Sequence, residues 1–429
     1  MPPEVLKSGK YYTRYIEKQI ETALHTSGAV LVTGPRFSGK TTTSMLFQKS
    51  YIRLNTTSAV AMAKIDPKGT ITGEKPRLID EWQTVPDIWN QIKNSLDENY
   101  EFGSYILTGS STPAERKDIF HSGTGRITEV RMRPMSLYES GDSDGKVSLG
   151  DILEGKEIAA DTNEDFTIER LAYLIARGGW PVSVLADESF ALDVTRNYYQ
   201  GLFNFENSEN ERFRNKRPEV LKMLVKSLAR NISSEASSET IIKDIRQSNE
   251  RTMDRKTFDE YHDALRDIFV IDDLEAWLPS FRSATVMRTS PIRHFNDPSV
   301  ALASLDMWPA DLLSDRETFG LFFEDFAVRD LRVYTEYLGG EVRHYRDSSG
   351  LECDAVLHFR NGKWGAVEIK LGGEENIEKG AASLLRLKRK LEEKSTEKAP
   401  SFLMVLVGKG PMYRRRDGVY VVPVNRLRA

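Results

Sequence analysis

Short apolar runs alternate with longer mixed segments over the first third of the chain. Five of these runs have the length and composition of buried strands, at residues 29–33, 51–54, 77–80, 105–108 and 127–132. Residues 11–24 carry Tyr12, Ile16, Ile20 and Leu24 four positions apart, which predicts a helix. Strands separated by segments long enough for crossover helices are typical of a parallel α/β sheet with right-handed connections.

The pattern changes after residues 141–150, which are rich in Gly, Ser and Asp and read as a loop or a domain boundary. From about residue 165 to residue 315 helix patterns dominate, for example at 220–229 and 240–246. An apolar run at 268–278 is the exception and can form a hairpin. Helices followed by a hairpin fit a winged-helix module.

Strand and helix patterns alternate again in the last part of the chain. The expected elements are a helix at 319–338, strands at 341–345, 352–359 and 364–369, a helix at 378–393, and strands at 402–407 and 419–424. The chain is therefore expected to be an α/β multidomain protein. We place the domains at 1–150, 151–315 and 316–429, with a mostly helical winged-helix domain in the middle.

The composition of the 429-residue chain is that of a globular protein, with 39% hydrophobic and 29% charged residues. No run of about 18 apolar residues is present, so no transmembrane helix is expected. The N-terminus lacks the apolar region of a signal peptide, and the single cysteine, Cys353, excludes an internal disulfide. These features favour a cytoplasmic protein without a membrane partner, in which Cys353 is a reduced core thiol.

The net charge of −4 gives no argument for nucleic-acid binding by the chain as a whole. Residues 386–429 differ, because they hold 12 Lys and Arg against four Asp and Glu, an excess of eight positive charges. Such a stretch fits a phosphate-binding surface or a solvated helix face and tail equally well. In the first case, arginines 414–416 are expected to contribute to salt-sensitive DNA binding.

A phosphate-binding loop follows the first apolar run. Residues 34–41 read Gly-Pro-Arg-Phe-Ser-Gly-Lys-Thr, a complete G-x-x-x-x-G-K-[ST] motif between a strand and a segment at 42–49 that can form a helix. The two glycines let successive N–H groups turn toward phosphate oxygens. Lys40 is expected to reach the β- and γ-phosphates, and the Thr41 hydroxyl to bind Mg²⁺. The positions expected to contact the nucleotide are Gly34, Pro35, Arg36, Phe37, Ser38, Gly39, Lys40, Thr41 and Thr42.

Carboxylates and hydroxyls are expected beside this loop. Asp80 and Glu81 end a neighbouring strand, where Asp80 can hold the Mg²⁺ shell and Glu81 can polarise the attacking water. Thr108 and Ser110, at the end of a third strand, can sense the γ-phosphate or orient the water. Arg126 fits either an arginine finger toward the nucleotide of a second copy, which implies a homo-oligomer, or a surface salt bridge. The set predicts hydrolysis of a nucleoside triphosphate.

Several motifs accompany the loop along almost the whole chain. They are Ile79-Asp-Glu-Trp-Gln83, Leu107-Thr-Gly-Ser-Ser111, Gly125-Arg-Ile127, Arg133-Pro-Met-Ser136, Gly178-Gly-Trp-Pro181, Phe295-Asn-Asp-Pro298, Phe323-Glu-Asp-Phe326 and Val367-Glu-Ile-Lys370. Together they resemble a large group of uncharacterised prokaryotic AAA-type ATPases. The resemblance implies ATP rather than GTP, a winged-helix middle domain, and a C-terminal domain of unknown function that resembles the restriction-endonuclease fold. Many members have Gln where this chain has Phe37, a difference that bears on polar contacts at the loop edge and not on phosphate binding.

A second group of charged residues lies in the last domain. Asp354 and the pair Glu368 and Lys370 have the D…E-x-K form of a metal-dependent nuclease site. In such a site two carboxylates hold Mg²⁺ against the scissile phosphate, and a lysine helps to activate water or steady the developing charge. Glu324, on the preceding helix, resembles the additional acid that such folds often place near the metal.

The turn between the two strands decides whether this group can assemble. Glu368 and Lys370 are two positions apart on a strand and therefore share a face. A two-residue loop at 361–362 would leave Asp354 on the opposite face, whereas a three-residue loop at 360–362 pairs Asp354 with Glu368. We predict the three-residue loop, with Gly362 in the left-handed conformation.

These features support three functional hypotheses. In the leading one, Mg²⁺-dependent ATP hydrolysis drives a DNA-directed protein through the winged-helix and nuclease-like domains. In the second, the protein is a nucleotide-dependent regulatory switch whose C-terminal domain binds but does not cleave. A small-molecule kinase is disfavoured, because the Asp80 and Glu81 pair suits water activation and the sequence shows no obvious motif for an acceptor substrate.

Overall fold

The computed structural model describes residues 11–109, 123–162, 165–203, 216–249, 253–278, 290–393 and 399–429. The chain divides into two compact units. Unit 1 comprises Met1–Pro134 with Asp267–Phe269, and unit 2 comprises Met135–Arg266 with Val270–Ala429. Among the described helices, none combines the length and the hydropathy that a membrane crossing requires.

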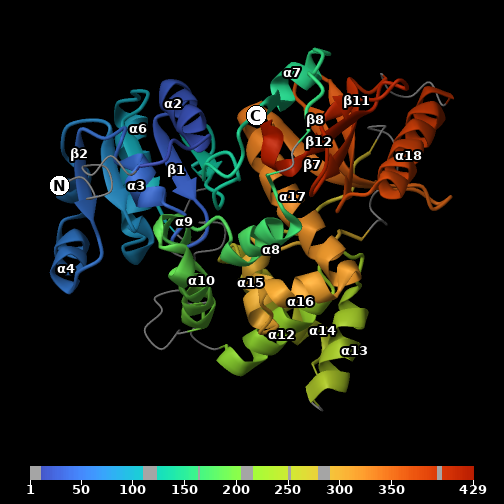
Figure 1. Cartoon of the computed structure of the whole chain (residues 1–429). Helices are drawn as coiled ribbons and strands as arrows, with labels where there is room; N and C mark the ends of the chain where they lie inside the picture. The colour runs from blue at the N-terminus through green and yellow to red at the C-terminus, as the bar shows by residue number, and fades with distance from the viewer. Residues whose placement is uncertain are drawn as a thin grey trace. The chain divides into compact units, whose positions relative to one another are not determined.

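Unit 1 is built around a five-stranded sheet in the order β2-β3-β4-β1-β5, in which every pair is parallel. The strands are β1 (Ala29–Thr33), β2 (Ser50–Arg53), β3 (Arg77–Asp80), β4 (Tyr105–Thr108) and β5 (Ile127–Arg131). The helices are α2 (Ile16–Thr26), α3 (Lys40–Ser44), α4 (Thr57–Ile65), α5 (Pro67–Ile71) and α6 (Asp87–Glu98) (Figure 1). The parallel α/β sheet expected from the sequence is therefore confirmed.

Both faces of this sheet are covered, because successive side chains of β1 alternate between two cores. Leu31 belongs to the cluster that contains Trp89 and Ile92 of α6, whereas Val30 belongs to the cluster that contains Ile16 and Ile20 of α2. Burial on both faces explains why the central strands β1, β3 and β4 appear in the sequence as mostly apolar runs.

Two helices of unit 1 differ from the sequence-based expectation. The first helix begins at Ile16 instead of residue 11. Before it, the Tyr11 hydroxyl bonds with Thr43 of α3, and the Arg14 guanidinium donates to Ser38 O of the phosphate-binding loop. The helix after that loop, α3, ends at Ser44, although the sequence allowed it to continue to Lys49. The strand positions differ from those expected by one residue at most.

The first half of unit 2 is mostly helical. Its helices are α7 (Leu149–Leu153), α8 (Ile168–Arg177), α9 (Pro181–Leu185), α10 (Glu188–Gly201), α12 (Pro218–Arg230), α13 (Ser238–Asn249), α14 (Arg255–Asp267), α15 (Pro298–Ser304) and α16 (Pro309–Ser314). Within the run predicted to form a hairpin, Ile271 pairs with Phe295 and Leu274 with Ile292 in isolated antiparallel bridges. Residues 279–289, between the two bridged segments in the sequence, lie outside the described residues.

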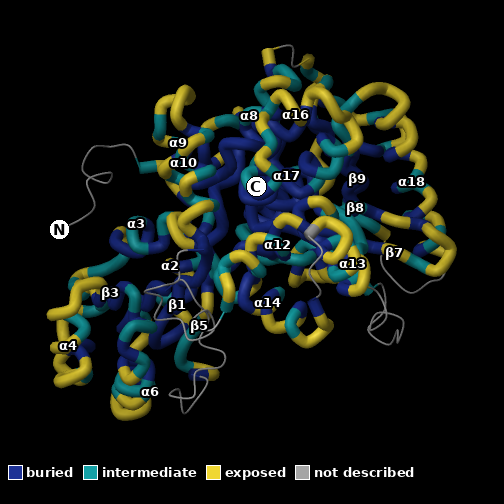
Figure 2. The backbone as a smooth tube through the Cα atoms, turned by 90° about the horizontal axis from the view of Figure 1, so that it is seen from below, coloured by how far each residue is buried: buried dark blue, intermediate teal, exposed yellow. Residues whose placement is uncertain are grey.

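The second half of unit 2 contains a six-stranded mixed sheet in the order β11-β12-β10-β9-β8-β7. The strands are β7 (Gly340–Arg346), β8 (Glu352–Phe359), β9 (Trp364–Lys370), β10 (Phe402–Val407), β11 (Tyr413–Arg414) and β12 (Tyr420–Pro423). Helix α17 (Arg316–Tyr337), whose N-cap is Asp315, precedes these strands. Helix α18 (Glu374–Glu393) is the crossover connection between the parallel strands β9 and β10. Figure 2 shows β8 and β9 buried and α18 with an exposed outer side. Cys353 is a buried free thiol, as predicted, and burial raises its pKa.

The segment after Pro134 packs against the C-terminus of the chain. Strand β6 (Val147–Ser148) pairs in parallel with β13 (Leu427–Arg428), and Asp161 bridges to Met412. The amide of Leu137 donates to Asp330 Oδ2 on α17 at 2.9 Å. Residues 141–150 are therefore anchored to the same unit that holds the six-stranded sheet.

Candidate functional site

The phosphate-binding loop leaves the C-terminal end of β1 and turns through two left-handed glycines. Gly34 has φ +137° and Gly39 has φ +98°. A Cβ atom on Gly34 would lie 2.1 Å from the backbone oxygen of Met132, so only glycine fits there. Phe37 also has a positive φ, of 62°, and its side chain is exposed at the loop edge.

Lys40 lies inside this loop. Its Nζ donates to the backbone oxygens of Gly34 at 2.9 Å and Pro35 at 2.7 Å. Burial lowers the pKa of Lys40 to about 8, while Glu81 and Asp80 oppose this shift. The lysine predicted to reach the phosphates is therefore bound by the backbone of the loop, near the carboxylates of Glu81 and Asp80.

Asp80, at the end of β3, is the centre of a polar cluster. Its Oδ1 accepts hydrogen bonds from Thr41 Oγ1 at 2.7 Å and from Thr108 Oγ1 at 2.5 Å. Its Oδ2 accepts from Arg53 Nε at 2.9 Å. The structure thus brings together Thr41, Asp80 and Thr108, three of the residues singled out in the sequence, and adds Arg53, which was not predicted.

Glu81 follows directly and has left-handed backbone angles, φ 59° and ψ 41°. Such angles cost a non-glycine residue on the order of 1 kcal/mol and are found most often at functional sites. Gln83 donates a hydrogen bond to the Glu81 carboxylate. The side chain predicted to polarise water is therefore held by its neighbour in a strained turn.

Arg14 is a second site residue that sequence reasoning missed. Its guanidinium is buried and donates to the backbone oxygens of Ser38 at 2.9 Å and Arg133 at 2.7 Å. Ser38 belongs to the phosphate-binding loop, and Arg133 follows β5. Arg14 therefore joins the loop to the chain that leaves the sheet.

Two predicted residues are not part of this cluster. Ser110 lies outside the described residues. Arg126 precedes β5 at the edge where the parallel strands begin, whereas the phosphate-binding loop lies where they end. Arg126 pairs with Asp97 of α6, which is the salt-bridge alternative; its role toward a second copy stays a prediction.

The second group of charged residues assembles around a hairpin of unit 2. The pairing of Ala355 with Val367 and of Val356 with Ala366 sets Asp354 opposite Glu368. Gly362 has φ +75°, and the Phe359 amide donates to Lys363 O, which closes a three-residue loop. The predicted loop and register are confirmed.

Lys370 joins the two carboxylates of this group. Its Nζ lies 3.0 Å from Asp354 Oδ2 and 2.8 Å from Glu368 Oε2. Burial, with a contribution from Asp354, raises the pKa of Glu368 to about 7. The same two causes raise the pKa of Glu324 on α17, so the three acids are close enough to repel one another. Within the described ranges, no set of three or more His, Cys, Asp or Glu side chains is arranged to hold a metal ion by itself.

The Glu368 carboxyl makes stability depend on pH. Its folded pKa of about 7 exceeds the ordinary value of 4.5, because ionisation of the buried carboxyl destabilises the fold. The protein is therefore most stable with respect to this group below pH 4.5, and this stability is lost as the pH rises through 7. We expect Glu368→Gln to raise the free energy of unfolding at pH 8 by about 2 kcal/mol, and by much less at pH 5. Urea unfolding in EDTA at the two pH values measures this. An equal change at both would contradict it.

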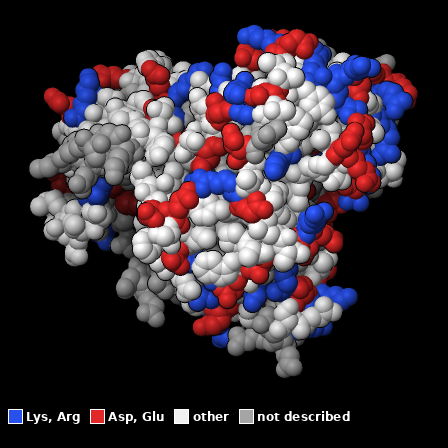
Figure 3. All heavy atoms as spheres, in the orientation of Figure 1, with Lys and Arg blue, Asp and Glu red and all other residues white. Residues whose placement is uncertain are grey.

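Part of the positive stretch at 386–429 is compensated by acidic side chains of unit 2. Arg414 pairs with Glu157, Arg415 with Glu378 and Asp417, and Arg426 with Asp144. In contrast, Arg386 and Arg389 are exposed on α18, and neither forms an ion pair with an acidic side chain that the structure describes. Figure 3 shows the resulting mixture of basic and acidic side chains around β11 and α18.

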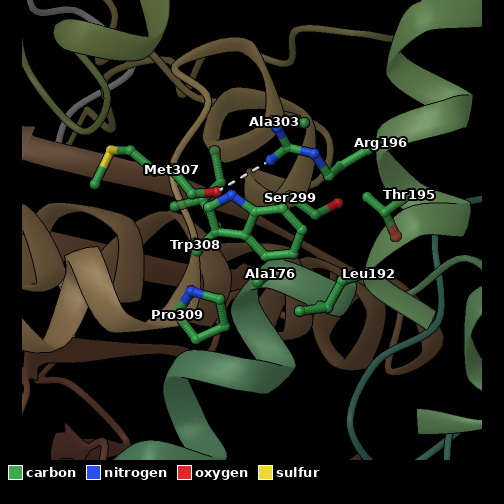
Figure 4. A pocket seen from close by; sticks show the side chains of 10 residues that line it. Ala176, Leu192, Thr195, Arg196, Ser299, Ala303, Met307, Trp308 and Pro309 are labelled. Carbon is green, nitrogen blue, oxygen red and sulfur yellow. Dashed lines mark hydrogen bonds between the residues drawn. The ribbon is translucent and has the colours of Figure 1, made fainter. Parts of the chain in front are cut away.

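A small hollow in unit 2 is not a ligand site. It encloses about 10 Å³ between Trp308, Arg196 and Ser299 (Figure 4). The Arg196 guanidinium lies over the Trp308 ring, 4.4 Å from its centroid, and pairs with Asp306. This space holds no more than about one water molecule.

Three family models match parts of the chain. Residues 26–140 match an AAA domain, and residues 168–311 and 319–427 match two domains of unknown function, DUF8612 and DUF4143. Uncharacterized proteins of Mycobacterium bovis and Mycobacterium tuberculosis are each 30% identical over 131 residues. That match covers 29% of this chain and 29% of either relative.

Two solved structures are similar at low sequence identity. A Walker-type ATPase of Pyrococcus abyssi is 14% identical, with a TM-score of 0.42, over 67% of this chain and 94% of the other. A signal-transduction ATPase with a tetratricopeptide repeat sensor from Pyrococcus horikoshii is 12% identical, with a TM-score of 0.24, over 76% of this chain and 48% of the other. Together, the AAA domain match, the loop motif and the parallel sheet identify the first part of this chain as a nucleotide-binding P-loop ATPase domain.

Proposed function

We propose that the protein hydrolyses ATP with Mg²⁺ and uses this hydrolysis to control a nuclease-like C-terminal domain that acts on DNA. The observation that carries the proposal is the cluster of Thr41, Asp80 and Thr108 beside Lys40 and Glu81. Because Thr41 donates its proton to Asp80, its oxygen lone pairs are free for a metal. Bound Mg²⁺ would neutralise charge on the phosphates.

Each residue of the cluster has a role in this proposal. Residues 34–42 bind the phosphates, with Lys40 as the cation nearest the β- and γ-phosphates. Thr41 would hold Mg²⁺, and Asp80 would hold the water shell of the metal. Glu81 accepts a proton from the attacking water, and Thr108 keeps Asp80 oriented.

We retain the three domains predicted from the sequence, at 1–150, 151–315 and 316–429 with a winged helix in the middle, although residues 135–150 belong to the second compact unit. Helices α12, α13 and α14, followed by the bridges at Ile271 and Leu274, support this assignment. Arg255 and Arg266 of α14 are paired with acids, so this helix offers little free positive charge. The DNA contact is therefore better assigned to α18, with Arg386 and Arg389.

For the C-terminal domain we propose that Asp354 and Glu368 hold Mg²⁺, that Glu324 assists, and that Lys370 steadies the scissile phosphate. Burial, together with repulsion from Asp354, raises the pKa of Glu324 and Glu368, and this supports the proposal because a divalent cation would relieve the repulsion. We also propose a cytoplasmic location and, because of Arg126, a homo-oligomer.

A second function, a regulatory switch that binds without cleaving, is supported by Lys370. Its ammonium contacts both carboxylates and so takes the place in which a metal would bind. In this alternative the C-terminal domain only recognises its partner.

One experiment separates the two functions. Phosphate release and strand cleavage are measured together with Mg²⁺, ATP and double- and single-stranded DNA. We expect cleavage by the wild type, loss of cleavage in Glu368→Gln, and ATP turnover within about twofold of wild type in that variant. ATP turnover without cleavage of any DNA by the wild type would favour the switch. No ATP turnover under any condition would refute the proposal as a whole.

A further inference from the structure

Arg53 donates a hydrogen bond to Oδ2, the second oxygen of the Asp80 carboxylate. Arg53 ends the edge strand β2 and is the register partner of Asp80 on β3. Its Nε lies 2.9 Å from Asp80 Oδ2, and the Asp80 side chain is 5% exposed whereas that of Arg53 is 41% exposed. A buried carboxylate is therefore paired with a cation that reaches it from the solvent side.

The pairing is not needed to hold the two strands together. The strands β2 and β3 are already joined by backbone pairing over four residues, and the Leu54 amide donates to Asp80 O at 3.0 Å. An ion pair with one half-exposed partner adds little to stability, because water competes for the guanidinium. The backbone pairing of β2 with β3 therefore does not depend on this ion pair.

The hydrogen bonds of Asp80 show where a metal-bound water would compete. Oδ1 already accepts from Thr41 and Thr108, so Oδ2 is the oxygen that remains for a further donor. Arg53 occupies this oxygen. The single bond from Arg53 Nε takes one of the two lone pairs of Oδ2, and the charges of Arg53 and Asp80 cancel while the pair is formed, so the paired carboxylate attracts a cation and its water shell less strongly.

We propose that Arg53 is a positioning residue that keeps Asp80 charge-compensated until Mg²⁺ arrives with the triphosphate. Without nucleotide, the compensated pair would hold Mg²⁺ only weakly. With ATP, the phosphates would supply the missing negative charge, and Asp80 Oδ2 would be available to the water shell of the metal. This role rests on the ATP site proposed above and concerns the order in which metal and nucleotide bind.

The test compares ATP affinity with and without metal. A fluorescent ATP analogue is titrated in Mg²⁺ and in EDTA. For each variant, the dissociation constant in EDTA is divided by the dissociation constant in Mg²⁺. For Arg53→Gln we expect this ratio to rise about tenfold, equivalent to roughly 1.4 kcal/mol, because an uncompensated Asp80 repels the metal-free nucleotide and attracts the metal. Arg53→Lys keeps the charge and is expected to stay close to the wild type.

The matched control is Lys64→Gln, which removes a positive charge from the exposed side of α4 in the same unit and leaves Asp80 untouched. Because the ratio is independent of the fraction of folded protein, a loss of stability alone does not change it. An unchanged or lower ratio in Arg53→Gln, with nucleotide binding intact, would overturn the role of Arg53 alone. A wild type that binds no nucleotide in either solution would overturn the ATP site as well.

Discussion

Replacement of Glu81 by glutamine is expected to lower ATP turnover by about 100- to 1,000-fold while ATP affinity stays within about twofold of wild type. Glu81 follows the strand that carries Asp80, and its strained backbone and the hydrogen bond from Gln83 hold the carboxylate in place. Glutamine has nearly the same shape but cannot accept the proton of the attacking water. Binding by Lys40 and Thr41 does not depend on that proton.

Phosphate release at saturating ATP measures the turnover, and titration of a fluorescent ATP analogue measures the affinity. Glu21→Gln is the control, because Glu21 is an exposed acid of α2 in the same unit. More than a tenth of the wild-type turnover in Glu81→Gln would show that another group activates the water.

Replacement of Arg329 by methionine is expected to destabilise unit 2 by about 3–5 kcal/mol. Arg329 of α17 is buried and donates to Asp297 Oδ2 at 2.9 Å and to Asp330 Oδ1 at 2.7 Å. The same two carboxylates accept from the amides of Gly179 and Leu137. Removing the guanidinium leaves two buried carboxylates without their cation, and methionine fills the space but not the charge.

Urea unfolding followed by circular dichroism measures this loss. Arg316→Met, at the exposed start of the same helix, is expected to change stability by less than about 0.5 kcal/mol. Adding Asp330→Asn to Arg329→Met should recover part of the loss, since one of the two unpaired charges is then removed. A loss below about 1 kcal/mol in the single variant would mean that the carboxylates find other partners.

The sequence by itself determined the elements and turns that carry both candidate sites. Residues 29–33, 77–80 and 105–108 were predicted with their bounds, because strands buried on both faces are continuous apolar runs. The pairing of Asp354 with Glu368 followed from the length of one loop and the two-residue period of a strand. These features depend on residues only a few positions apart in the sequence, so a local sequence pattern predicts them.

Contacts between distant segments were decided only by the tertiary structure. Arg14 binds partners 24 and 119 residues away, and Arg53 reaches Asp80 across 27 residues. The pairing of Arg329 with Asp297 likewise depends on how α17 packs, and the charge of Arg414 is compensated by Glu157, 257 residues away. An arginine has the same local pattern whether it faces water, a carboxylate or a phosphate. Its role is set by the groups that folding brings within hydrogen-bond distance. Because these groups are far away in the sequence, a local sequence pattern does not predict them.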